Sequence, residues 1–142
     1  MRSMKIKLTL AALLFSPMLA LAHHGFDMFD FDKTLTLKGT IKEWQWTNPH
    51  SWIQLNVEEK GVVTEWSLEG SSISQLARRG WKRNSLKPGD QVVVTVHPLK
   101  NGKPGGQWAQ VSDTNGKVLG TNDVPGAGGR GPGGPPPAAS KN

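Results

Sequence analysis

The stretch LTLKGTIKEWQW, residues 35–46, decides the fold of this chain. Its first half alternates apolar or small side chains with polar ones, which is the period of a strand with one buried face. Trp44 and Trp46 then carry the apolar pattern on the opposite parity. A change of parity within one run predicts a β-bulge near Lys42-Glu43 or a strongly bent strand. Bent, bulged first strands are typical of small barrels, because a sheet closes only when its strands curve.

Two more strand patterns and a helix signal follow this stretch. Residues 53–57 alternate apolar and polar side chains, and the apolar positions of 62–68 continue the pattern after a turn at 58–61. Ser72, with Gln75 three residues later, matches a capping box. Gly80 is placed to end a short helix.

The remaining segments complete the order of elements. They comprise a turn at 86–90, a strand at 92–96, a loop at 102–106 and a hairpin formed by 107–111 and 117–119. Three strands, one helix and then two or more strands is the order of the OB-fold. We therefore predict an all-β domain with one short helix, folded as a small five-to-six-stranded OB-like barrel. An SH3-like barrel or an open antiparallel meander is the alternative.

The N-terminus is typical of a cleavable signal peptide. Residues 1–7 are basic, residues 8–21 are apolar, and Ala20-Leu21-Ala22 is the small-residue pattern of a cleavage site. The apolar run is short for a membrane span, which needs about 20 residues. We expect export to the periplasm, cleavage after Ala22 and a mature protein that does not span the membrane.

Composition sets the domain boundaries. Residues 123–142 are rich in Gly, Pro and Ala and have little to bury, so we expect a disordered tail. The barrel domain is then 23–122, after the signal peptide 1–22. The chain contains no Cys, which excludes disulfides and thiolate ligands, and its net charge is +6. Removing the three cations of the signal peptide leaves +3.

Cleavage after Ala22 makes His23 the first residue of the mature chain. His23 then offers a free α-amine beside its imidazole, and His24 adds a second imidazole. His50, at a turn between the first two predicted strands, or His97, at the end of the fourth, would complete the site. Nitrogen donors in a tetragonal arrangement suit Cu(II). The metal hypothesis is therefore a copper ion bound by His23 and His24 together with His50 or His97.

The second hypothesis is an interaction module without a metal. Its Trp-rich strand ends, or the basic cluster at 78–83, would dock an envelope protein or polymer. The six Trp residues are expected to build the core rather than to stack on bases. Because the mature charge is also mild, no nucleic-acid partner is expected. No enzyme is expected, since the chain lacks Gly-x-Ser-x-Gly, a phosphate-binding loop and His-Glu-x-x-His.

Several motifs together resemble a known family. They are His23-His24-Gly25-Phe26, Gly39-Thr40-Ile41, Trp46-Thr47-Asn48-Pro49-His50-Ser51-Trp52-Ile53, Ala77-Arg78-Arg79-Gly80-Trp81 and Leu86-Lys87-Pro88-Gly89-Asp90. In combination they are similar to the domain of unknown function 6152 family of small exported bacterial proteins. The resemblance implies a signal peptide and a small β-barrel, and it implies no particular activity. Its two His-bearing motifs match His23, His24 and His50, whereas His97 matches none, so the resemblance selects His23, His24 and His50 as the copper ligands.

Overall fold

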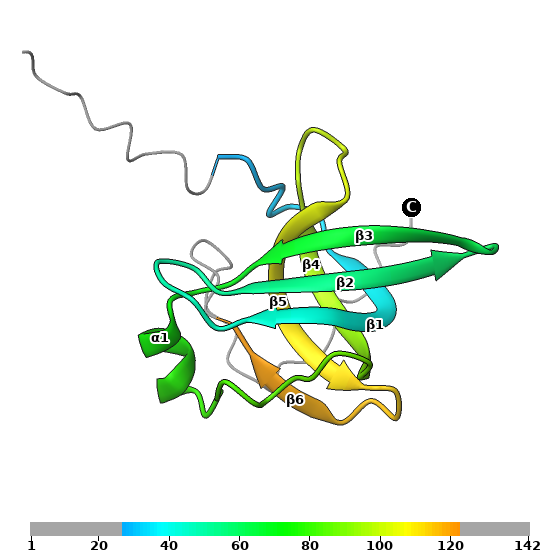
Figure 1. Ribbon diagram of the computed structural model, residues 1–142. Coiled ribbons are helices and arrows are strands. Elements are labelled where there is room, and N and C mark those ends of the chain that lie inside the picture. The colour runs from blue at the N-terminus through cyan, green and yellow to red at the C-terminus, as the bar shows by residue number, and fades with distance from the viewer. Residues whose placement is uncertain (1–26, 123–142) are drawn as a thin grey trace, which may run out of the picture.

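The computed structural model describes residues 27–122. Within them the chain forms six strands and one short helix (Figure 1). In chain order these are β1 (Leu35–Gln45), β2 (Trp52–Glu59), β3 (Val62–Glu69), α1 (Ile73–Arg78), β4 (Gln91–Pro98), β5 (Gly105–Asp113) and β6 (Val118–Thr121). The predicted signal peptide, the histidine pair and the predicted tail lie outside the described residues, so these remain predictions.

The strands close into a barrel with an extra strand at one edge. The sheet order is β3-β2-β1-β4-β5-β6, and β3 also pairs with β5. This last pairing is parallel, from Ser67 opposite Gly105 to Glu69 opposite Gln107. Five strands therefore form a closed ring, and β6 extends it from β5. The prediction of a small OB-like barrel is confirmed, and the open meander is excluded.

β1 bends so that it belongs to both halves of the barrel. Its first part pairs with β4, from Leu35 to Thr40, and its second part pairs with β2, from Thr40 to Gln45. In the β2 ladder the register shifts between Ile41 and Glu43. The extra residue is Lys42, so the predicted bulge is confirmed. It moves the apolar positions to the other parity and turns both Ile41 and Trp44 into the core.

α1 begins and ends as its sequence predicts. The Ser72 hydroxyl accepts from the Gln75 amide at 3.4 Å, and the Gln75 side-chain oxygen accepts from the Ser72 amide at 3.3 Å. Two amides that the helix cannot satisfy are thereby paired. Gly80 follows the C-cap with φ +88°, a left-handed conformation in which a side chain is strained.

Loss of this cap should have a modest cost. We expect Ser72→Ala to lower the free energy of unfolding by about 1 kcal/mol, because the Gln75 amide loses its acceptor. Urea unfolding followed by circular dichroism measures the difference. Ser72→Asn retains a capping oxygen and should lose less than half as much. Equal losses for the two variants would show that the cap does not stabilise this short helix.

Three tryptophans lie at the centre of the core. Trp108 is fully buried, and its ring centroid lies 5.2 Å from that of Trp81 and 6.2 Å from that of Trp44. Trp46, Trp52 and Trp66 are half-buried, so none of the six is exposed. The expectation of a packed core is confirmed.

A segment before β1 packs along the end of β4. The Asp30 amide donates to the Pro98 carbonyl at 2.8 Å, and the Lys100 amide donates to the Met28 carbonyl at 2.9 Å. Phe29 pairs with Leu99 in an isolated bridge and is buried. The segment that leads back towards the histidine pair is therefore attached to the barrel as far as Met28. Between residues 27 and 122, no helix has the length and apolar character needed to cross a bilayer.

Candidate functional site

His50 lies on an ordered turn between β1 and β2. The Thr47 hydroxyl donates to the His50 carbonyl at 2.8 Å, and the Asn48 side-chain oxygen accepts from the Ile73 amide at 3.3 Å. The first of these bonds closes the turn on itself, and the second ties it to the start of α1. The peptide bond between Asn48 and Pro49 is cis. The backbone that carries the His50 ring is thus fixed within its own turn and to the start of α1.

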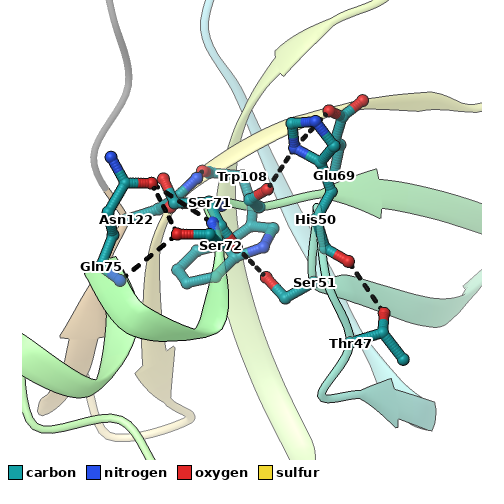
Figure 2. A network of polar contacts seen from close by, with 10 residues as sticks. Thr47, His50, Ser51, Glu69, Ser71, Ser72, Gln75, Trp108 and Asn122 are labelled. Atoms are coloured by element: carbon teal, nitrogen blue, oxygen red, sulfur yellow. Dashed lines mark hydrogen bonds and ion pairs between the residues drawn. The ribbon is translucent and has the colours of Figure 1, made fainter.

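The His50 ring faces a carboxylate at the end of β3. Its Nδ1 lies 2.9 Å from Glu69 Oε1 and 3.3 Å from the Gly70 carbonyl oxygen. Figure 2 shows the ring and the carboxylate pointing toward one another. Because both partners accept hydrogen bonds, Nδ1 is the ring nitrogen that carries the proton. Nε2 has no hydrogen bond to any described residue, and the side chain is 44% exposed.

Glu69 is the buried member of this pair. It is only 9% exposed, whereas the His50 side chain reaches the surface. Burial raises the pKa of the Glu69 carboxyl, because the charged form loses hydration, and the nearby His50 opposes that shift. A buried carboxylate with one hydrogen-bonded imidazole partner holds that partner in a single orientation.

A set of backbone and side-chain bonds fixes the strands on which this pair sits. The Ser51 amide and hydroxyl both donate to the Ser71 carbonyl, at 3.1 and 2.9 Å, and the Gly70 amide donates to the Ser51 carbonyl at 2.8 Å. Asn122 accepts from the Ser71 amide at 2.9 Å and donates to the Trp108 carbonyl at 2.8 Å. The start of β2 and the end of β3 are therefore joined to each other and to β5 (Figure 2).

His97 lies in a different environment. It is 8% exposed, its Nδ1 lies 2.9 Å from the Lys33 carbonyl oxygen, and the Phe31 ring lies 5.3 Å away. Gln107 of β5 lies between His97 and Glu69, because Gln107 is the ladder partner of both residues. The role of His97 is structural: it holds the segment before β1 against β4. It does not join His50.

The described residues supply only part of the predicted metal site. Between residues 27 and 122, no three His, Asp or Glu side chains gather closely enough to hold an ion. His50 and Glu69 form a pair, and the other two predicted ligands, His23 and His24, lie outside the described residues. A copper site therefore depends on those two residues approaching His50.

Sequence reasoning identified His50 but missed Glu69 as its partner. The sequence contains several carboxylates, and nothing near Glu69 in the sequence pairs it with a histidine. The link is the register of the β2–β3 hairpin, which places Trp52 opposite Glu69 and so brings His50, two residues earlier, to the same end. The turn itself consists of Lys60 and Gly61, and counting seven residues outward from Glu59 and from Val62 gives the pairing of Trp52 with Glu69.

Comparison with known proteins identifies a family for this chain. A family model described as "Family of unknown function (DUF6152)" matches residues 12–109, more than two thirds of the chain. Comparisons with curated proteins and with solved structures find no match. The matched region contains His23, His24, His50 and all of the barrel strands through the first half of β5. The chain belongs to the DUF6152 family, a family of unknown function with a small barrel fold.

Proposed function

We propose that this protein is exported to the periplasm, is not an enzyme, and binds one copper ion through His23, His24 and His50. Cleavage after Ala22 supplies the first ligands, because it frees the α-amine of His23 beside its own imidazole. An amine and an imidazole on one residue chelate a metal. Further imidazoles complete the nitrogen set that Cu(II) favours.

The observation that carries this proposal is the state of the His50 ring. Metal-binding histidines generally donate one ring N–H to a carboxylate or backbone carbonyl, which fixes the tautomer and leaves the other nitrogen for the ion. His50 has this arrangement, with Nδ1 on Glu69 and Gly70 and Nε2 at the surface. The Nδ1 atom of His97 also lies close to a backbone carbonyl oxygen. The His97 side chain is buried, however, so it is a poor candidate ligand.

The segment leading to the histidine pair supports a shared site. Asp30 and Lys33 border the same hollow of about 260 Å³ as Trp66. Trp66 belongs to β3, three residues before Glu69. His24 precedes Asp27 by three residues, which span about 10 Å when extended. The segment before β1 and strand β3, which ends at Glu69, therefore border the same hollow.

Copper titration of four processed proteins tests the proposal. The chain starting at His23 should bind one Cu(II). His50→Ala should weaken binding by at least about tenfold, since even a residue that only orients a ligand contributes 10- to 100-fold. Acetylation of the His23 α-amine should also weaken binding, because it removes the amine as a donor. His97→Asn retains a donor near Nδ1 and should bind as the parent does.

Electron paramagnetic resonance gives a second readout of the same complexes. The parent spectrum should show nitrogen couplings, and the His50→Ala spectrum should show one fewer imidazole. Equal affinities and identical spectra for the parent and His50→Ala would refute the shared site. A mature N-terminus at any residue other than His23, measured by mass spectrometry, would refute the amine ligand.

We propose as a second candidate function that the protein docks on an anionic partner through its basic surface. We define the basic surface as Arg78, Arg79, Lys82, Arg83 and Lys87, all of which are exposed. The other docking surface considered, one of Trp rings, would depend on Trp46, Trp52 and Trp66, which are half-buried, so the exposed cations are the better supported surface. The basic surface does not include His50, so the two functions are compatible.

A further inference from the structure

Charge is segregated on this barrel. The connection from Ser72 to Gly89 carries five cations and no carboxylate. The rest of residues 27–122 carries seven cations and ten carboxylates, so it is net negative. The positive charge of the described domain is therefore concentrated on one connection, which carries α1 and the loop that leads to β4 (Figure 1).

Three buried side chains hold this connection in place. Leu76 is fully buried, and Trp81 and Leu86 are 4% and 3% exposed. The Trp81 indole donates to the Thr121 carbonyl at 2.9 Å, and the Trp44 indole donates to the Lys82 carbonyl at 3.2 Å. Because these apolar side chains turn inward, the connection is held to the barrel while its five cations are exposed to solvent.

Four of the five cations have no ion-pair partner in the described part of the chain. Arg78, Lys82, Arg83 and Lys87 form no ion pair with any residue between 27 and 122. Arg79 donates to the Thr121 hydroxyl at 3.4 Å. Such a cluster attracts anions from solution and orients the protein towards them.

Exposed apolar side chains lie beside these cations. β6 runs next to the connection, where Gly120 packs on the Trp81 ring and Thr121 accepts its indole N–H. The two residues before Gly120, Val118 and Leu119, are 49% and 46% exposed. An anionic lipid surface satisfies both kinds of side chain, because it offers phosphates to the cations and an acyl boundary to the apolar side chains.

We propose that the basic surface, together with Val118 and Leu119, docks this protein on a membrane of anionic phospholipid. The ligand chemistry is a plane of phosphate headgroups, which arginine binds through paired N–H donors. This inference specifies the partner of the second candidate function and rests on it. It is independent of the copper site, which uses a different set of residues.

Vesicle binding tests the inference with the chain from His23 to Asn142. The protein should co-sediment with phosphatidylglycerol vesicles at low salt and not with phosphatidylcholine vesicles, and 0.5 M NaCl should release it. Each cation beside such a surface contributes roughly fivefold to binding. Arg78→Glu with Arg83→Glu should therefore weaken binding by at least about 25-fold.

A matched variant separates docking from a general effect of net charge. Lys60→Glu with Lys103→Glu changes the net charge by the same amount, on the β2–β3 turn and the β4–β5 loop, away from the connection (Figure 1). It should weaken vesicle binding by less than about threefold. All four positions are exposed, so both proteins should fold, which circular dichroism verifies.

Several results would overturn the inference. These are equal binding to both kinds of vesicle, equal losses for the two charge-reversed proteins, or displacement by free inorganic phosphate at constant ionic strength. The last result would indicate a discrete anion site instead of a surface. Binding to an acidic protein but not to vesicles would place a protein on this surface. His50→Ala should leave vesicle binding unchanged, so failure of the copper proposal and failure of this one are distinguishable.

Discussion

Replacement of Trp108 by alanine is expected to lower the free energy of unfolding by roughly 3–5 kcal/mol. The side chain is fully buried and its ring packs edge-on against both Trp44 and Trp81. Its removal leaves a cavity that these large, rigid rings cannot fill. Small domains have only about 5–15 kcal/mol of total stability, so the variant should be close to unfolding at moderate temperature.

Trp108→Phe is the control for this prediction. Phenylalanine keeps a six-membered ring between Trp44 and Trp81, and it removes an indole N–H that has no hydrogen-bond partner among the described residues. A buried donor without a partner costs about 1–3 kcal/mol, so its loss offsets part of the lost packing. We expect a decrease below about 2 kcal/mol. Urea unfolding followed by circular dichroism compares the variants, and equal losses would contradict a core centred on this ring.

The parts of the fold that local sequence encodes could be predicted. The change of parity between Ile41 and Trp44 predicts the bulge, because side chains in a strand alternate strictly between two faces. The pair of Ser72 and Gln75 predicts the start of the helix, since each side chain satisfies an amide within the same turn. Both signals lie within a few residues, so neither depends on the rest of the structure.

The closure of the barrel could not be predicted in the same way. Residues 102–106 were expected to form a loop, whereas β5 begins at Gly105 and pairs in parallel with β3. The expectation was wrong because two consecutive glycines show no alternation of side chains. Their function is to let three strands approach closely, and such a requirement appears only when all three are in place.

The candidate site shows the same division. His50 was identified because Asn48-Pro49 marks a turn and the ring adjoins it in sequence. Glu69 lies 19 residues further along, and only the β2–β3 register brings it within 2.9 Å of the ring. The burial that raises its pKa is a property of the assembled barrel. The approach of His23 and His24 remains a prediction, since it concerns residues before 27.

The glycine at the closure of the barrel gives the second large prediction. A Cβ at Gly106 would lie 2.3 Å from the His97 carbonyl oxygen and 2.5 Å from Val96 Cγ1. The carbonyl belongs to the β4 backbone and cannot rotate away. Gly106→Ala should therefore force β4 and β5 apart where β5 also pairs with β3. We expect the free energy of unfolding to fall by roughly 3 kcal/mol, at the upper end of the cost of overpacking.

Gly105→Ala distinguishes this steric conflict from the general effect of replacing glycine in a strand. A Cβ at Gly105 would meet the Leu99 Cδ1 methyl at 2.8 Å and the Ser67 carbonyl oxygen at 3.1 Å. The Leu99 side chain can rotate, so the conflict is smaller, and alanine restricts the unfolded chain equally in both variants. Gly105→Ala should lose less than half as much stability as Gly106→Ala. Equal losses in urea unfolding would mean that the backbone conflict at Gly106 costs no more than the side-chain conflict at Gly105. The close approach of β4 and β5 at Gly106 would then not determine how the barrel closes.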